Sequence, residues 1–392
     1  MSKRALTFAV AATALAGCNP DSATSPDVAA APEFAAVKFW EAGATVAWNE
    51  HASNLAASQP STLPLDVGRL YLYLSLAQLR AAEAAAETPG PHPPTTAAIG
   101  GASAAILTAF FPAKTTEIEG LLDAQAAAAP WPGGKHQDFA AGEAIGRAVA
   151  ARVLAYAAGD LTGLTNPGTP PIGPGFWLWN GGPIARGGLG ARPVFLASGS
   201  EFRPAPPPAY GSAEFLAALA EVRLIADTRT AEQIAIANYW NVNQSPRSEA
   251  AMMGLARELI VAHRRNDAEA ARIFFLMSGA AFDAIIGCFD AKYHYWFLRP
   301  VHADPGIATV FPTPPHPSYP SAHSCVSGAL TGVLGEVFPS ERDRVDALAE
   351  EASVSRLYAG IHYRFDMVAG LELGRNVAAK AMGADLTAVA VQ

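Results

Sequence analysis

The sequence has little charge and no concentration of cations. Only 16% of its 392 residues are charged, the formal net charge is −8, and no lysine- or arginine-rich block occurs. Nucleic-acid binding depends on clustered cations that neutralise phosphates. We therefore expect no nucleic-acid partner.

Cysteines are also scarce, because the chain contains three, at positions 18, 288 and 325. So few cannot form the disulfide framework of a small secreted domain. Cys288 and Cys325 lie on segments that also carry candidate site residues. We interpret both as small buried thiols of a core.

The N-terminus has the pattern of a targeting segment. A positively charged start precedes a short apolar stretch at 5–15, which ends in Leu-Ala-Gly-Cys18. That stretch is too short to span a bilayer as a stable helix. We predict a lipoprotein signal peptide at 1–17, lipidation of Cys18 and a flexible tether at 18–33. The chain is then exported and anchored by lipid to a bacterial membrane, on its periplasmic or extracellular face; the alternative is a signal peptide cleaved without lipidation.

The remaining sequence favours helices. About half of the chain is hydrophobic, alanine is abundant, and β-branched runs are short and few. We predict an all-α protein, with residues 34–212 and 213–392 forming one structural domain. A Pro/Gly-rich loop at about 160–212 interrupts the helical pattern and suits a lid or a functional loop. The predicted helices are 34–57, 65–87, 95–110, 138–158, 213–227, 230–241, 247–264, 267–297, 322–338, 341–358 and 362–384.

The first chemically informative segment runs from Lys292 to Pro300. Lys292 and Arg299 are seven residues apart, which is two turns of a helix, so we expect them on one helical face before Pro300 redirects the chain. Two cations among tyrosine, tryptophan and phenylalanine are costly to bury without an anion. A snorkelling amphipathic face is the alternative.

The second segment is Pro-His316-Pro-Ser-Tyr-Pro-Ser321-Ala-His323. The apolar run after His323 predicts a helix that begins near Ser321. The first turn of a helix offers unpaired N–H groups and the positive end of the dipole, so it suits an anion. Ser321 alone is equally typical of an ordinary N-cap.

The third segment is Ser-Arg356-Leu-Tyr-Ala-Gly-Ile-His362-Tyr-Arg-Phe-Asp366. His362 and Asp366 are four residues apart and so neighbours on a helical face. A carboxylate on one ring nitrogen fixes the tautomer and raises the basicity of the other nitrogen. A surface His–Asp pair is the alternative for this segment alone.

Taken together, the three segments provide three cations, a hydroxyl at a helix start and two histidines. This set meets the needs of a tetrahedral oxyanion. The pattern Lys-x6-Arg-Pro, Pro-Ser-x-His and Ser-Arg-x5-His-x3-Asp resembles the PAP2/vanadium haloperoxidase superfamily. The motifs cover about 292–366, and the helices before them are similar to the family's larger helical bundle.

The resemblance implies a role for each matching residue. Lys292, Arg299 and Arg356 would bind the equatorial oxygens of vanadate or phosphate. Ser321 and a backbone N–H at Ala322 would assist them. The family usually has glycine where this chain has Ala322; a positive φ there would strain the oxyanion seat.

The two histidines receive distinct roles from the same resemblance. His362 would be the axial vanadium ligand, or the nucleophile of a phosphatase, oriented by Asp366. His323 would be the general acid/base on the apical side, and Lys292 would polarise bound peroxide.

The pocket alone leaves oxidation and hydrolysis open, because vanadate mimics the five-coordinate state of phosphoryl transfer. The chain's length and its Gly-Ile-His362-Tyr-Arg-Phe-Asp366 segment are similar to the haloperoxidase branch. His316 stands where algal bromoperoxidases have histidine, and Phe289 precedes Lys292 by three residues. We therefore place both on the halide side, although a loop histidine and a core phenylalanine are the alternatives.

The favoured function is a vanadium-dependent haloperoxidase that uses hydrogen peroxide to oxidise halide, bromide before chloride, to hypohalous acid. One alternative is an acid phosphatase that hydrolyses a small phosphoester through a phosphohistidine and needs no vanadate. The other is a lipid-anchored oxyanion-binding protein without turnover. The sequence leaves the organic substrate and the oligomeric state open.

Overall fold

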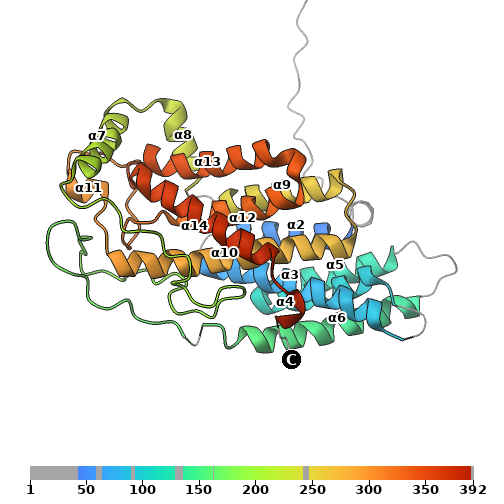
Figure 1. The fold of residues 1–392 in the computed structure, drawn as a ribbon. Coiled ribbons are helices and arrows are strands. Elements are labelled where there is room, and N and C mark those ends of the chain that lie inside the picture. Colours follow the sequence, from blue (N-terminus) through green and yellow to red (C-terminus); the bar gives the residue numbers. More distant parts are fainter. Residues whose placement is uncertain are drawn as a thin grey trace, which may run out of the picture.

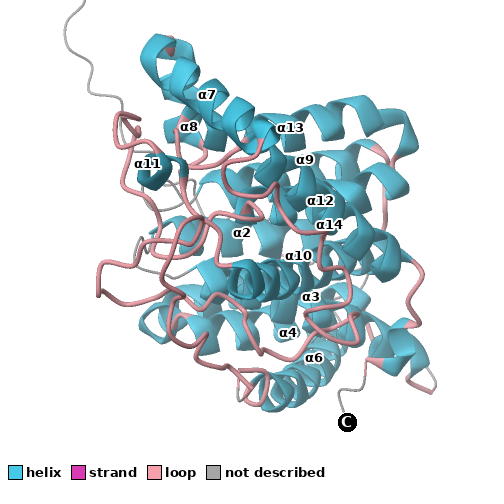
Figure 2. Ribbon diagram, turned by 60° about the vertical axis from the view of Figure 1, so that its left-hand side comes forward, coloured by secondary structure: helices cyan, strands magenta, loops and turns pink. Residues whose placement is uncertain are grey.

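The computed structural model describes residues 43–58, 64–89, 93–128, 136–161, 163–241 and 247–389. Over these residues the chain consists of helices joined by loops (Figure 2), with a single isolated antiparallel bridge between Phe176 and Phe297 and no strand. The prediction of an all-α protein is confirmed. The predicted signal peptide, tether and Cys18 lie outside the described residues.

Most helices lie where the sequence predicts them, and a few bounds differ. The first described helix begins at Ala44, and the predicted residues before position 43 lie outside the described part. The helix Thr115–Ala127 was not predicted, because it buries little apolar surface and carries Gly120 at its centre. The longer helices are α2 (Ala44–Ser58), α3 (Pro64–Glu87), α4 (Thr95–Phe110), α5 (Thr115–Ala127), α6 (His136–Ala157), α7 (Ala213–Thr228), α8 (Ala231–Tyr239), α9 (Arg247–Ala262), α10 (Asp267–Tyr295), α12 (Ala322–Val337), α13 (Arg342–Tyr358) and α14 (Arg364–Met382). Four short ones are η1 (Pro112–Lys114), α11 (Pro300–Ala303), η2 (Pro339–Glu341) and η3 (Leu386–Ala388).

Helix α10 is the central element of the bundle (Figure 1). It packs against α3 on one side and against α12 and α14 on the other. It is long and apolar enough to cross a membrane by composition, but 89% of its most apolar window is buried within the protein. Its length therefore serves the core, and it joins the N-terminal helices to those that carry the three sequence motifs.

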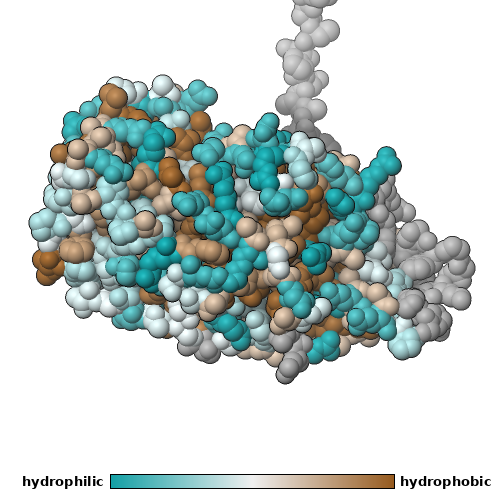
Figure 3. All heavy atoms as spheres, in the orientation of Figure 1, coloured by the Kyte–Doolittle hydropathy of each residue, from teal (hydrophilic) through white to brown (hydrophobic). Residues whose placement is uncertain are grey.

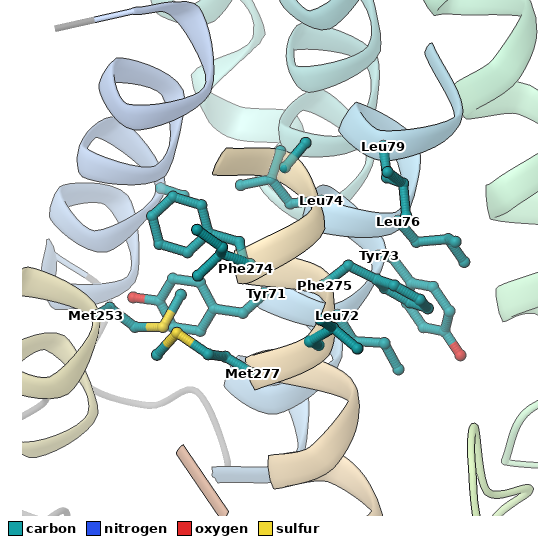
Figure 4. Close-up of a cluster of buried hydrophobic side chains, with 14 of the residues drawn as sticks. Tyr71, Leu72, Tyr73, Leu74, Leu76, Leu79, Met253, Phe274, Phe275 and Met277 are labelled. Carbon is teal, nitrogen blue, oxygen red and sulfur yellow. The ribbon is translucent and has the colours of Figure 1, made fainter. Parts of the chain in front are cut away.

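The main hydrophobic core includes residues from α2 through η3. Figure 4 shows its centre, where Tyr71 and Leu72 of α3 lie beside Phe274 and Phe275 of α10, and Met253 of α9 approaches from the side. Burying such side chains contributes roughly 1.5–3 kcal/mol each. On the face drawn in Figure 3, hydrophobic and hydrophilic residues are interspersed.

Helix α10 ends earlier than predicted, at Tyr295. Trp296 has a left-handed backbone with φ of 50°, and its N–H donates to the carbonyl of Lys292. Arg299 has an extended backbone because it precedes Pro300, and it is the N-cap of α11. The prediction that Lys292 and Arg299 share a helical face is therefore wrong. The two residues meet because the chain turns back between them.

The described residues of the predicted loop, 160–161 and 163–212, contain no helix, and the loop is tied to α10. The buried carboxylate of Asp283 accepts hydrogen bonds from three consecutive backbone N–H groups, those of Val194, Phe195 and Leu196, at 2.7, 2.6 and 2.9 Å. Further along α10 the Tyr295 hydroxyl donates to the carbonyl of Pro204 at 2.6 Å. These bonds replace the regular hydrogen bonding that a loop lacks.

We expect Asp283→Ala to lower the free energy of unfolding by about 3 kcal/mol, because it leaves three N–H groups without an acceptor. Urea unfolding would measure this loss. Asp290→Ala is the matched control, since it removes the partly exposed ion pair with Arg203 that ties the same loop to the same helix and should cost less than about 1 kcal/mol. Equal urea midpoints for the two variants would contradict a specific role of Asp283.

Candidate functional site

The site lies at the C-terminal end of α10, where the segments around residues 299, 316–323 and 356–366 converge. Lys292 is fully buried, and its ammonium donates to the carbonyls of Pro317 at 3.0 Å, Ser318 at 2.9 Å and Pro320. The three carbonyls accept from all three ammonium protons, but the carbonyls carry no net charge. The cation is therefore hydrogen-bonded without being neutralised.

Arg299 connects the first segment with the other two. Its guanidinium donates to the carbonyl of Ile361 at 2.8 Å and to that of His316 at 3.2 and 3.1 Å. It also lies 3.1 Å from Nε2 of His362 and 3.0 Å from Nδ1 of His316. A guanidinium can only donate, so Nε2 of His362 accepts and carries the lone pair.

His362 and Asp366 form the predicted pair. Nδ1 of His362 lies 2.8 Å from Oδ2 of Asp366, and this oxygen also accepts from the Ser318 hydroxyl at 2.6 Å and from the Tyr363 N–H at 3.1 Å. Helix α14 starts at Arg364, so the pair forms across the start of a helix and not along a helical face, as had been predicted. With Nδ1 protonated towards Asp366, the lone pair of His362 is on Nε2, in agreement with the contact to Arg299.

Ser321 is the N-cap of α12, and its hydroxyl oxygen accepts from the Ser324 N–H at 3.4 Å. The first N–H groups of the helix have no intrahelical acceptor, and they point out of its N-terminus. Ala322 opens the helix. In the described part of the chain the non-glycine residues with a left-handed backbone are Arg264 and Trp296. The anticipated strain at Ala322 is therefore not found.

Arg356 and His323 lie on the α8 side of the site. Arg356 is 3% exposed, donates to the Ala237 carbonyl at 3.2 Å and lies over the Phe311 ring at 5.1 Å. His323 is in the first turn of α12, is partly exposed, and places Nε2 at 2.8 Å from the Trp240 carbonyl.

The site has an excess of buried positive charge. Lys292, Arg299 and Arg356 are each at most 3% exposed, and in the described part of the chain their hydrogen-bond partners are carbonyls, a hydroxyl and ring nitrogens. Asp366 is the buried carboxylate among them. Burial lowers the pKa of Lys292 to about 8 and that of Arg356 to about 9. A bound anion would remove this penalty.

The histidines respond to the same environment. Burial, followed by the charge of Arg299, lowers the pKa of His362, while burial and then Arg356 lower the pKa of His323. Burial also raises the pKa of Asp366 to about 6. Near pH 8 the rings are therefore neutral and Asp366 is ionised, so Nε2 of His362 carries an unprotonated lone pair, which here accepts from Arg299.

We expect the affinity of the site for sulfate to fall as the pH rises through about 8, because Lys292 then loses its charge. Sulfate is a suitable probe because its own charge is constant between pH 6 and 9. Calorimetric titration at several pH values measures the effect. Lys292→Met should bind sulfate more weakly and flatten this pH dependence; an unchanged profile in that variant would show that another group titrates.

The structure also brings together the two residues that were predicted for the halide side. His316 is 8% exposed and contacts Arg299, while its ring lies 5.2 Å from that of Phe289. Phe289 belongs to an aromatic cluster with Trp177, Tyr293 and Trp296. The two residues predicted for the halide side therefore contact each other beside Arg299.

Several contributors were missed from the sequence. Ser318 bonds Asp366, and its place in the Pro-Ser-Tyr-Pro run was a usable signal. Ala237 and Trp240 contribute only main-chain carbonyls. A carbonyl is present at every residue, so no side-chain pattern distinguishes these two positions.

Comparison with known proteins gives relatives in sequence and in fold. Residues 272–384 match the sequence model of the PAP2 superfamily, so this part of the chain is a PAP2 superfamily domain. A bacterial vanadium-dependent iodoperoxidase superposes with a TM-score of 0.70 at 25% identity, covering 86% of this chain and 96% of that one. No curated protein matches the chain by sequence.

A bacterial vanadium-dependent chloroperoxidase is also similar in structure. Its apo form has a TM-score of 0.63 at 14% identity and covers 81% of this chain and 92% of that one. Its holo form has the same TM-score and identity and covers 83% and 94%. At this identity the likeness concerns the fold, which is the all-α fold of the vanadium haloperoxidases.

Proposed function

We propose that the protein is a vanadium-dependent haloperoxidase that uses hydrogen peroxide to oxidise a halide, bromide in preference to chloride, to hypohalous acid. The observation that carries the proposal is the set of three buried cations beside His362, whose Nε2 lone pair faces Arg299. The structural likeness to a bacterial vanadium-dependent iodoperoxidase and chloroperoxidase supports it.

The residues present fit vanadate. The anion would compensate the positive charge of Lys292, Arg299 and Arg356, and the α12 N-terminus would supply N–H donors. A single imidazole nitrogen with a lone pair is the ligand that the metal would need. When bound, vanadate supplies Lewis-acid activation of peroxide.

The chain's own groups have separate tasks. Lys292, Arg299 and Arg356 bind the oxygens of the anion and hold negative charge that develops on them. Asp366, itself held by Ser318, keeps the proton of His362 on Nδ1.

Proton transfer to and from a bound ligand is assigned to His323. Its lowered pKa keeps it a neutral base near neutral pH, so it takes a proton from entering peroxide. It would then return this proton to a departing hydroxide, which leaves as water.

His316 and Phe289 are proposed to form the halide side of the site. Their rings touch, and His316 also contacts Arg299, so a halide at this edge would meet a polarised N–H or ring edge next to a cation. The preference for bromide rests on the histidine at this position.

The PAP2 match supports one second candidate, an acid phosphatase in which His362 attacks a phosphoester and His323 protonates the leaving alcohol. The arrangement of the His362 lone pair serves either reaction. Two assays on the wild-type chain separate the candidates.

Bromide-dependent halogenation of a reporter phenol, requiring vanadate and peroxide, is the expected result. Hydrolysis of an aryl phosphate without vanadium, inhibited by vanadate, would instead identify the phosphatase. Absence of both activities in a chain that binds sulfate would identify an oxyanion-binding protein without turnover.

We further propose that the protein is exported and anchored to a bacterial membrane through lipid on Cys18. The sequence pattern that ends at Cys18 supports this location. Mass spectrometry of the N-terminal peptide from membranes would detect diacylglycerol on Cys18, and Cys18→Ser should release the protein into the soluble fraction. A wild-type chain found without lipid would contradict the anchor.

A further inference from the structure

The C-terminal end of α8 contacts two residues of the site through its backbone. The carbonyl of Ala237 accepts from Arg356 at 3.2 Å, and that of Trp240 lies 2.8 Å from Nε2 of His323. Carbonyls in the last turn of a helix have no intrahelical partner and form the negative end of its dipole. Helix α8 thus presents a partial negative charge to a guanidinium and an imidazole that have no carboxylate partner in the described part of the chain.

Helix α8 is held at both of its ends. Thr230 and Gln233 form a capping box at its start. At its end the buried indole of Trp240 donates to Oε1 of Glu351 on α13 at 2.9 Å. Glu351 lies five residues before Arg356 on the same helix, so α13 contacts the end of α8 at two places.

The contact with Trp240 determines which nitrogen of His323 carries the proton. A carbonyl oxygen only accepts, so Nε2 must be protonated. In the neutral ring the lone pair is then on Nδ1. Nδ1 is therefore the ring nitrogen that can accept a proton from a bound ligand.

We propose that Trp240 and Glu351 are positioning residues for proton transfer: their indole–carboxylate bond places the Trp240 carbonyl so that it holds His323 in the Nε2–H tautomer, with Nδ1 as the transferring atom. This inference rests on the proposed function for its kinetic consequence. The tautomer itself is a property of the chain without ligand.

The charged and titratable groups that face His323 are Arg356 from α13, Lys292 from α10 and His316 from the preceding loop. The two cations lower the pKa of His323, whereas the hydrogen bond to the Trp240 carbonyl raises it, because that bond stabilises the imidazolium. Displacing the carbonyl should therefore move the pKa of His323 further down.

The direct test is nitrogen NMR of ¹⁵N-histidine-labelled protein without vanadate, with His323 assigned through His323→Gln. The two ring nitrogens report the tautomer. We expect protonated Nε2 and unprotonated Nδ1 in the wild type, and a mixture of tautomers in Glu351→Leu. Glu351→Gln should restore the wild-type spectrum, since its amide oxygen still accepts from the indole. Glu350→Leu is the matched control, an exposed neighbour on α13 whose partner is Arg375.

The kinetic test uses the same variants in bromide oxidation. Glu351→Leu should lower kcat/KM about tenfold, in the range for residues that orient a ligand or catalytic group. The limb of the pH profile that reports His323 should move to lower pH. Sulfate affinity should change little, because all three cations remain and neither Lys292 nor Arg299 contacts α8. Trp240→Phe removes the same hydrogen bond from its other end, so combining it with Glu351→Leu should add little.

The outcomes distinguish this inference from the proposed function. Protonated Nδ1 in the wild type, or Glu351→Leu with wild-type spectra and pH profile, would overturn the positioning role even if the protein halogenates phenol. The expected tautomers in a wild-type protein that does not halogenate would support the positioning role and remove the proposed function.

Discussion

Replacing His362 with alanine should lower halogenation by at least about 100-fold, the lower end of what a positioned catalytic side chain contributes. His362 presents its Nε2 lone pair beside Arg299, and the ring is fixed by Asp366. Any phosphatase activity should fall equally, because the same nitrogen would be the nucleophile. Initial rates with saturating peroxide, bromide and vanadate, and separately with an aryl phosphate, measure both losses.

Two controls make this result interpretable. His294→Ala changes an exposed histidine on α10 and should retain full activity. The His362→Ala protein should still bind sulfate, because its cations remain. Sulfate binding would show that the site is folded in this variant. A His362→Ala protein with wild-type rates would reject the assignment of the site.

The hydrogen bonding of the cations is the reason why we expect this site to select an anion. Lys292 bonds three carbonyls, Arg299 bonds two, and Arg356 bonds one. Neutral acceptors satisfy donors but leave the buried charge uncompensated. A tetrahedral dianion supplies both acceptors and charge, so its binding is favoured over that of a neutral ligand of the same size.

The sequence predicted the composition of the site better than its geometry. Lys292, Arg299 and His362 were identified because cations and imidazoles among apolar residues are rare without a function. The predicted arrangement of these residues was wrong in detail. Helical spacing was assumed between Lys292 and Arg299, where Trp296 ends the helix, and between His362 and Asp366, although α14 begins only at Arg364. Backbone conformation at a helix end depends on tertiary packing, which a local pattern does not encode.

The same limit applies to partners that act through the backbone. Helix α8 was predicted from its apolar pattern, but nothing in that pattern indicates that its last carbonyls contact Arg356 and His323. At Ala322 the sequence predicted a strain that the structure does not contain. The departure from glycine suggested strain, yet the residue opens a regular helix, where a methyl group is tolerated.

Asp366→Asn should change the binding of two anions in opposite directions. It removes the buried carboxylate of the site, so the affinity for sulfate should rise, because the excess positive charge increases. The affinity for vanadate should fall by about 10–100-fold, because vanadate needs the Nε2 lone pair of His362, and an amide no longer enforces protonation of Nδ1. At pH 8 wild-type Asp366, with its pKa raised to about 6, is ionised, so the comparison is made there.

Equilibrium titrations of the ligand-free proteins with each anion measure this divergence. Ser318→Ala is the control, since it keeps the carboxylate and removes only one of three hydrogen bonds to Oδ2; its vanadate affinity should fall less than tenfold and its sulfate affinity should be unchanged. A parallel rise of both affinities in Asp366→Asn would mean that vanadate is held by charge alone. His362 would then be no ligand, because a nitrogen ligand is the feature that would make the site distinguish vanadate from sulfate.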